Sequence, residues 1–236
     1  MKKLFIALLL APLMAHAAGG ELHLDRAPDR TGNNAALQHG AKLFVNYCLS
    51  CHSASEMRYN RLHDIGLNDK EIKDNLLFTA DKVGELMTIA MRRDDAKKWF
   101  GVPPPDLTLE ARARTSEAGS GADWLYTYLR SFYRDDSRPT GWNNTVFPNV
   151  AMPNVLWQLQ GEQVLGADGK LKLEKAGQLS PAAYDADVAD LVGYLQYMGE
   201  PAAPVRKRLG VYVLLFLAAF FVLAYALKRE FWKDIH

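Results

Sequence analysis

The sequence predicts a mainly α-helical domain followed by one membrane-spanning helix. Hydrophobic residues make up 49% of the 236-residue chain and charged residues 23%, a composition that excludes a disordered polypeptide. Several segments place apolar residues at the i, i+3, i+4 spacing of an amphipathic helix. Near the C-terminus, residues 209–227 contain no charged side chain. We therefore expect a signal peptide over residues 1–17, an exported domain over residues 18–205, and an anchor with a short tail over residues 206–236.

The formal net charge of +1 is an average over unlike parts of the chain. Residues 1–17 carry two lysines and no acid, and residues 206–236 carry six basic and two acidic side chains. The remaining residues 18–205 hold 20 basic and 25 acidic side chains, a net charge of −5. A nucleic-acid-binding domain has the opposite sign, so we expect no nucleic acid among the partners.

The N-terminus has the pattern of a secretion signal. Lys2 and Lys3 precede an apolar run over residues 4–13, and Ala15-His16-Ala17 places small residues at positions −3 and −1 of a cleavage site. The apolar run is too short to span a bilayer, which disfavours the alternative of a retained anchor. We expect the mature chain to begin at Ala18 and to work outside the cytoplasm.

The first predicted helix of the domain covers residues 35–52. Leu37, Ala41 and Phe44 lie on one face of it, and Gly40 leaves a notch where another helix could approach closely. Two further helices are predicted before residue 101. One is a short polar piece over residues 69–79, and the other is an amphipathic helix over residues 80–100 with the apolar stripe Val83, Leu86, Met87, Ala90 and Met91.

The second half of the domain alternates extended and helical segments. Pro103-Pro104-Pro105 makes residues 101–106 an extended stretch. A helix follows over residues 123–133, and apolar alternation around Ala167-Asp168-Gly169 predicts a hairpin over residues 160–177. The last helix of the domain begins at Ser180-Pro181 and ends before a proline-containing linker over residues 200–204.

The charge-free run over residues 209–227 predicts a transmembrane helix. At 1.5 Å per residue it is about 28 Å long, close to the thickness of the hydrocarbon layer. Aromatic residues, which favour membrane interfaces, lie near its two ends: Tyr212, Tyr225, Phe231 and Trp232. Basic residues flank both sides, so the signal peptide rather than the charge rule sets the orientation. The domain is then outside and the tail over residues 230–236 inside.

The strongest motif is Cys48-Leu49-Ser50-Cys51-His52, which holds both cysteines of the chain. A thioredoxin-like redox site would follow a strand in a βαβ pattern, which the sequence does not show. A zinc site would need further ligands at short spacing, and His39 and His63 are isolated. Covalent attachment of haem c explains every position, since two thiols one helical turn apart can form two thioethers and the adjacent histidine can bind the iron. We expect one haem c.

The sixth iron ligand must come from a segment far from His52. The candidate donors are Met57, Met87, Met91, Met152 and Met198, with His23, His39, His63 and His236. Methionine in an amphipathic stripe is more often core packing than ligand. Met152 differs because it lies between Pro148 and Pro153 in a loop that cannot be a regular helix. We therefore favour Met152, with core packing as the alternative.

The ordered set of motifs resembles the cytochrome c1 family, the haem-carrying subunits of the quinol–cytochrome c oxidoreductase, in its bacterial form. The motifs are Cys48-Leu49-Ser50-Cys51-His52, Met57-Arg58-Tyr59, Pro104-Pro105-Asp106-Leu107, Arg112-Ala113-Arg114, Ala151-Met152-Pro153, Leu195-Gln196-Tyr197-Met198-Gly199-Glu200-Pro201 and the C-terminal anchor. CxxCH alone marks only a c-type cytochrome, whereas this order of motifs is far more specific. The resemblance implies a cytochrome c-like haem domain with loop insertions.

The resemblance also implies roles for individual residues. Cys48 and Cys51 would hold the haem, with His52 as proximal and Met152 as distal iron ligand. Arg114, the second arginine of Arg-x-Arg, would contact a haem propionate, whereas Arg112 stays a solvated surface residue. Trp124 would line the haem, although residues 115–121 form a longer link than is usual in the family. Tyr197-Met198-Gly199 also departs from the family's usual Trp-Ala-Ala.

By this resemblance the protein is a single-pass subunit of the bacterial inner membrane, with its haem domain on the periplasmic side. It would pass single electrons from a Rieske iron–sulfur subunit to a soluble c-type cytochrome, in a complex with a cytochrome b subunit and membrane lipid. It would not be an enzyme by itself. The alternatives are another membrane-anchored c-type cytochrome, a haem enzyme such as a peroxidase, and a thiol–disulfide oxidoreductase. A haem enzyme would need an open iron position or a second haem.

Overall fold

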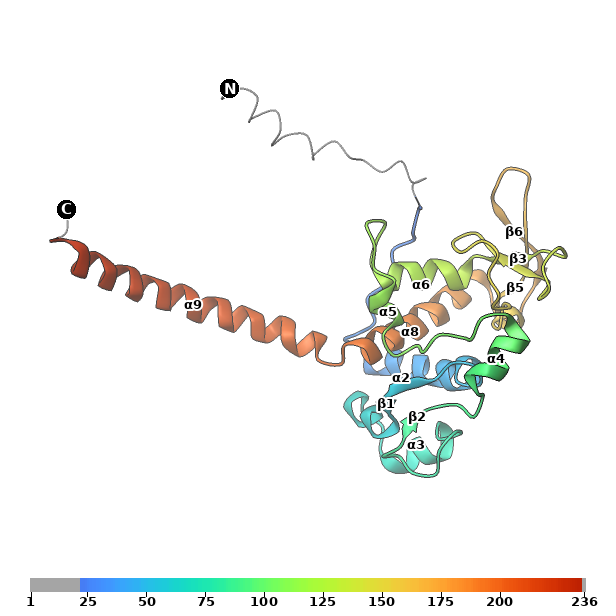
Figure 1. Ribbon diagram of the computed structural model, residues 1–236, viewed down its shortest axis with the longest axis horizontal. Helices are drawn as coiled ribbons and strands as arrows, with labels where there is room; N and C mark the ends of the chain where they lie inside the picture. The colour runs from blue at the N-terminus through green and yellow to red at the C-terminus, as the bar shows by residue number, and fades with distance from the viewer. Residues whose placement is uncertain (1–21, 235–236) are drawn as a thin grey trace, which may run out of the picture.

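The computed structural model describes residues 22–234, which form a mainly helical domain and a long C-terminal helix that leads away from it (Figure 1). The expected signal peptide, residues 1–17, and His236 lie outside the described residues. The predicted fold class is confirmed.

Two crossing helices organise the domain. α2 (Asn34–Leu43) packs along α8 (Pro181–Gly199), and α6 (Gly121–Arg130) covers α8 as well (Figure 1). The predicted notch at Gly40 is confirmed, because a Cβ atom there would lie 2.1 Å from the carbonyl oxygen of Asp190 on α8. The predicted start of α8 is also confirmed: the Ser180 side chain accepts a hydrogen bond from the amide of Ala183.

The first predicted helix does not run uninterrupted to residue 52. α2 ends at Leu43, a π-helical turn over Phe44–Cys48 follows, and a hydrogen-bonded turn then leads to His52. The buried side of this segment is as predicted, since Leu37, Ala41 and Phe44 are inaccessible to solvent or nearly so. π-Helical turns insert one residue into the helical ladder and are frequent at functional sites.

The predicted helix over residues 80–100 is wrong. Leu86–Met87 forms the short strand β2, which pairs antiparallel with β1 (Ala54–Arg58), and only α4 (Arg93–Phe100) is helical. Pairing of β2 with β1 overrides the helical spacing of the apolar residues in this segment. Met87 is buried opposite Ala54 of β1, whereas Ala90 is exposed. The polar piece at 69–79 is helical only over α3 (Asp69–Asn75), and a 3₁₀-helix over Tyr59–Ile65 precedes it.

Two further antiparallel pairs lie in the second half of the domain. The predicted hairpin is confirmed as β5 (Gly161–Leu165) paired with β6 (Leu171–Ala176). The helix predicted over residues 123–133 ends at Arg130, and Phe132–Arg134 forms β3, which pairs with β4 (Trp142–Asn144). Residues 103–106 form neither helix nor strand, and the expected extended stretch does not include Gly101, whose φ is 77°. The short helices α5 (Glu110–Ala113) and α7 (Trp157–Gln160) complete the domain.

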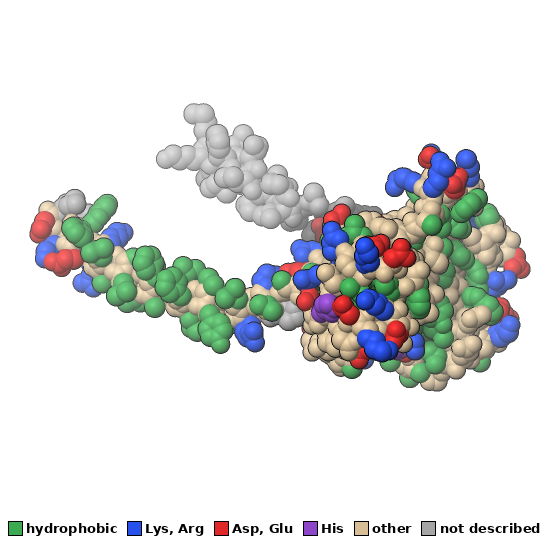
Figure 2. Space-filling view, turned by 90° about the horizontal axis from the view of Figure 1, so that it is seen from below, with side chains coloured by type: hydrophobic (Ala, Val, Ile, Leu, Met, Phe, Trp, Pro, Cys, Tyr) green, Lys and Arg blue, Asp and Glu red, His purple; other side chains and the backbone are tan. Residues whose placement is uncertain are grey.

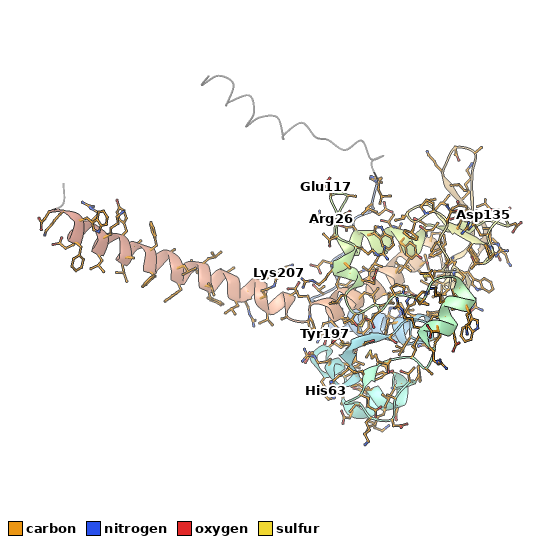
Figure 3. All side chains as sticks on the ribbon, viewed as in Figure 1. Arg26, His63, Glu117, Asp135, Tyr197 and Lys207 are labelled. Carbon is orange, nitrogen blue, oxygen red and sulfur yellow. The ribbon has the colours of Figure 1, made fainter. Side chains whose placement is uncertain are left out.

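α9 (Ala203–Trp232) has the properties of the predicted anchor. Its segment Val205–Trp232 is the one helix within residues 22–234 that is long and apolar enough to cross a membrane, and none of it is buried against the domain. Figure 2 shows its apolar side chains along the whole helix with basic residues at both ends. Lys207, labelled in Figure 3, lies at the end next to the domain.

Glu200 links α9 to the domain. Its carboxylate pairs with Arg206 of α9 at 2.6 Å and with Arg112 of α5 at 3.2 Å. Arg112 is otherwise exposed, as expected for a surface arginine. The linker between α8 and α9 is therefore held by an ion-pair bridge as well as by the chain itself.

We expect Gly40→Ala to destabilise the domain. The helix propensity of alanine would favour α2 by about 1 kcal/mol, but the new methyl group meets the backbone of α8, which cannot move aside as a flexible side chain would. The clash should lower the free energy of unfolding by about 1–3 kcal/mol, measured by denaturant unfolding followed by circular dichroism. Gly32→Ala, where no atom lies within 4 Å of an added Cβ, is the control. Equal stability of the two variants would contradict the close packing of α2 on α8.

Candidate functional site

The CxxCH motif lies at the end of the π-helical turn. The amides of Cys51 and His52 both donate to the carbonyl oxygen of Cys48, at 3.0 and 2.9 Å, which closes a tight turn over the motif. Cys48 is buried and Cys51 is partly exposed, and both are free thiols. Burial, helped by the nearby Cys51, raises the pKa of Cys48 to about 12. The thiol of Cys48 is therefore neutral at physiological pH.

The imidazole of His52 is oriented by one hydrogen bond. Its Nδ1 lies 2.7 Å from the carbonyl oxygen of Pro105, which can only accept, so Nδ1 carries the proton of the neutral ring. Nε2 then keeps its lone pair. Burial lowers the pKa of His52, against the opposing effects of the Pro105 hydrogen bond and of the Glu110 and Asp106 charges. A neutral ring with a free Nε2 is the form that binds a metal.

The Pro105 carbonyl is itself held in place by Asp106. The two carboxylate oxygens of Asp106 accept from the amide and hydroxyl of Ser55 at 2.8 and 2.6 Å, and from the amide and hydroxyl of Thr108 at 2.9 and 2.6 Å. The amide of Leu107 also donates to the carbonyl oxygen of Ser53 at 2.9 Å. These bonds fasten the proline-rich stretch to the residues that directly follow the CxxCH motif.

Met152 lies in a loop outside helix and strand, as predicted, and its side chain is half-buried against the core. Its sulfur accepts a hydrogen bond from the hydroxyl of Tyr128 on α6, with Oη 3.3 Å from Sδ. Tyr128 is buried, and burial raises its pKa above the usual range. The loop thus brings a thioether to the face of α6.

Two asparagines of β4 shape the Met152 loop. The buried side chain of Asn144 donates to the carbonyl oxygen of Tyr128 and accepts from the amides of Val146 and Phe147. Asn143 accepts from the amide of Asn149, whose φ of 63° is left-handed, a conformation that asparagine tolerates. We did not identify these two residues from the sequence. The sequence feature that could have identified them is the pair Asn-Asn just before a loop, because asparagine side chains accept hydrogen bonds from the backbone amides of turns.

Arg114 and Trp124 lie together beside Tyr128. The guanidinium of Arg114 is 4.5 Å from the centroid of the Trp124 ring, and Trp124 stacks on Tyr128 at 4.8 Å and 15°. Glu110 accepts from Nε of Arg114 at 2.7 Å, the one hydrogen bond of this guanidinium among residues 22–234. Three of the expected site residues, Arg114, Trp124 and Met152, therefore meet in one cluster centred on Tyr128.

Glu110 interacts electrostatically with both this cluster and the CxxCH motif. Its carboxylate is bound to Arg114, and its charge is one of those that act on the pKa of His52. The structure thus has two groups of candidate residues, Cys48, Cys51 and His52 on one side and the Tyr128 cluster on the other, with α5 near both.

Five of the other donors considered from the sequence are engaged elsewhere, whereas Met91 is partly exposed and His236 lies outside the described residues. Three methionines are buried in the hydrophobic core: Met57, Met87 and Met198. His39 pairs with Asp190 at 3.0 Å, His63 pairs with Asp69 at 2.7 Å, and His23 is exposed. Within residues 22–234 no three histidine, cysteine, aspartate or glutamate side chains converge as a metal site.

The chemistry of the donors suits a haem group. The chain offers two thiols closed into one turn, a neutral imidazole with free Nε2, a half-buried thioether, and a guanidinium with unused donors. These are the groups that thioether attachment, iron ligation and propionate binding require.

Comparison with known proteins gives the family. Residues 27–235 match the model described as the Cytochrome C1 family. The whole chain is 53% identical to the "Ammonia monooxygenase gamma subunit" of Nitrosomonas europaea, 99% of which is covered, and 50% identical to the "Cytochrome c1" of Allochromatium vinosum, which is covered completely. It is also 26% identical to the "Cytochrome b/c1" of Bradyrhizobium diazoefficiens; the match covers 86% of this chain and 34% of that protein.

Fold and comparisons together define a c-type cytochrome of electron transport with a C-terminal apolar helix long enough to span a membrane. Within that class, the chain belongs to the cytochrome c1 family. Membership of this family implies that the domain binds haem c.

We expect Asp106→Asn to loosen the clamp on the proline-rich stretch. An amide cannot accept both pairs of hydrogen bonds, so the free energy of unfolding should fall by about 1–3 kcal/mol at neutral pH. Partial burial acts to raise the pKa of Asp106, but the hydrogen bonds from Ser55 and Thr108 outweigh it and hold the pKa below its ordinary value. The carboxylate therefore stabilises the fold above the ordinary carboxyl pKa, and this contribution is lost as the pH falls through the lowered folded-state pKa.

The measurement is denaturant unfolding of the two proteins across a pH series. The stability difference should be full at neutral pH and should shrink as the pH falls below about 4. Asp136→Asn is the control, because Asp136 is exposed and makes no side-chain hydrogen bond among residues 22–234. A difference that stays constant to low pH would show that the charge of Asp106 does not hold the clamp.

Proposed function

We propose that this protein is the electron-carrying subunit of a quinol–cytochrome c oxidoreductase, with one haem c held by thioethers to Cys48 and Cys51. His52 is the proximal and Met152 the distal iron ligand, Arg114 binds a propionate, and Trp124 lines the haem. The hydrogen bond from Nδ1 of His52 to Pro105 carries the proposal, because it leaves Nε2 free in the motif that the family uses for haem.

Hydrogen bonds within the domain position the side chains that we propose as haem ligands. Bound haem c supplies a single-electron ferric–ferrous couple. Pro105 and Asp106 fix the ring plane and tautomer of His52, and Asn143 and Asn144 fix the loop that carries Met152. Arg114 offers its terminal nitrogens to an anionic group while Glu110 and Trp124 hold it. Side chains held in this way would need little movement when one electron is exchanged, and if His52 and Met152 both bound the iron, the site would suit electron transfer rather than substrate chemistry.

The partners follow from the proposed complex. A cytochrome b subunit is supported by the relative from Bradyrhizobium diazoefficiens, whose name joins the two cytochromes and of which this chain covers only 34%. A Rieske iron–sulfur subunit would deliver electrons, and a soluble c-type cytochrome would accept them. The net charge of −5 over residues 18–205 would favour a basic acceptor through long-range attraction.

We also propose the topology of the chain. Residues 1–17 are a cleaved signal peptide, residues 18–205 are a periplasmic haem domain, and residues 206–236 anchor it in the bacterial inner membrane through the span 209–227. The apolar surface of α9 contacts lipid and partner helices, and the residues after the span form a short cytoplasmic tail. The exposure of α9 along its length supports this role.

The name of the Nitrosomonas europaea relative suggests a second candidate. That protein is named as a subunit of an ammonia monooxygenase, and its 53% identity extends over the whole of this chain. The family match and the Allochromatium vinosum relative favour the first candidate, because they connect the same residues with cytochrome c1.

Purification of the complex separates the two candidates. The affinity-tagged full chain, extracted from membranes in mild detergent, should co-purify with a cytochrome b subunit and a Rieske subunit. Its reduced-minus-oxidised spectrum should show c-type and b-type bands together, and the preparation should reduce a soluble cytochrome c when given a quinol. A mock purification from cells without the tag is the control. A preparation that carries ammonia-oxidising monooxygenase subunits and no b-type haem would support the second candidate and overturn the first.

Covalent attachment gives a separate prediction. Acid–acetone extraction should leave haem on the denatured chain, and replacement of both Cys48 and Cys51 by Ala should remove it, because no thiol is left to form a thioether. Each single variant should keep haem through one thioether, with a shifted band in the pyridine haemochrome spectrum. Haem that extracts completely from the unmodified chain would contradict this attachment.

A further inference from the structure

We propose that Tyr128 is a positioning residue for Met152: its hydroxyl donates a hydrogen bond to the ligand sulfur and thereby aims the sulfur and raises the reduction potential. The inference rests on the proposed role of Met152 as distal ligand. Its basis is the 3.3 Å separation of Tyr128 Oη from Met152 Sδ. None of the sequence motifs pointed to Tyr128.

The ring of Tyr128 is held too firmly for this contact to be incidental. Trp124 stacks on one side at 4.8 Å between centroids, and Phe132 meets the ring edge-on at 5.0 Å and 66°. The side chain is 7% exposed, and the backbone carbonyl of the same residue is bound by the buried Asn144. Because ring and backbone are both fixed, the direction of the hydroxyl is set by α6 and β4 rather than by Met152.

The hydroxyl has one partner, the sulfur. A buried phenol without a hydrogen bond costs about 1–3 kcal/mol, and among residues 22–234 Met152 Sδ is the only atom to which Tyr128 Oη is hydrogen-bonded. Phenol is protonated at neutral pH and sulfur is a weak acceptor, so the tyrosine is the donor. The contact therefore satisfies the tyrosine and restrains the methionine at once.

A hydrogen bond to the sulfur changes what that atom can do as a ligand. A thioether sulfur has two lone pairs, so donation to one leaves the other for iron and selects its direction. The donor also draws electron density from the sulfur, which weakens its support for ferric iron more than for ferrous iron. Hydrogen bonds to ligand atoms tune metal sites in this way. Tyr128 should therefore favour the reduced state of the site.

The same chain contains an internal reference for this interaction. Tyr194 on α8 donates to the sulfur of Met87 at 3.6 Å, and both residues are wholly buried in the core. Removal of the hydroxyl of Tyr194 breaks a tyrosine-to-methionine contact of the same kind, with Phe44 and Tyr197 rather than Trp124 as aromatic neighbours of the tyrosine ring. Tyr194→Phe is thus a matched control for a purely structural effect.

The experiment compares Tyr128→Phe, Tyr194→Phe and Met152→Leu in the full chain with haem attached. The readouts are the reduction potential, the near-infrared charge-transfer band of sulfur-ligated ferric haem, and carbon monoxide binding to the reduced form. Tyr128→Phe should keep the band but lower the potential, by about a threefold shift of the redox equilibrium or about 28 mV. Carbon monoxide should displace the less restrained sulfur faster. Tyr194→Phe should change none of the three readouts.

The outcomes distinguish the inference from the proposed function. If Tyr128→Phe matches the wild type in potential and in carbon monoxide binding, while Met152→Leu abolishes the band, Met152 is the ligand and the role of Tyr128 is overturned. If Met152→Leu keeps the band, the distal ligand lies elsewhere and both proposals fail. An equal change of potential in Tyr194→Phe would overturn the role of Tyr128 as well, because it would show a general effect of core loosening.

Discussion

The close crossing of α2 and α8 at Gly40 is the constraint on which the rest of the domain depends. With no side chain at that position the two backbones come into contact, and α8 can then serve as the common wall for α2, α5 and α6. The π-helical turn and the CxxCH motif continue directly from α2, so their position is set by this crossing. The same wall supports α6, which carries Trp124 and Tyr128. The positions of both groups of candidate site residues therefore depend on the packing of α2 against α8.

Both groups are also held by the same kind of bond. Side chains of Asp106, Asn143 and Asn144 bind the backbone amides of Thr108, Asn149 and Val146, which lie in segments that have no helix or strand of their own. Such segments cannot satisfy their own polar groups, so short polar side chains take the place of regular secondary structure. Positions in loops can in this way be fixed nearly as well as positions in a helix.

The parts of the structure that could be predicted from the sequence are those with local causes. Ser180-Pro181 caps its own helix, the hairpin over residues 160–177 turns on its own glycine and aspartate, and the CxxCH motif carries its chemistry within five residues. The helix expected over residues 80–100 failed because Met87 is committed to β1, a partner about thirty residues away. Tyr128 was missed for the same reason, since its interaction with Met152 exists only after α6 and the loop meet. A contact between residues far apart in the sequence produces no periodic pattern of residues from which it could be predicted.

The ion-pair bridge at Glu200 has a consequence for motion. Only the segment from Glu200 to Ala202 separates α8 from α9, and three extended residues span at most about 11 Å. With so short a linker, to which the ion pairs of Glu200 with Arg112 and Arg206 add, the domain has no tether long enough to move between distant positions. If α9 anchors the chain in a membrane as proposed, the haem domain would stay at one place above it. The proposed electron donor and acceptor would then have to move to the domain.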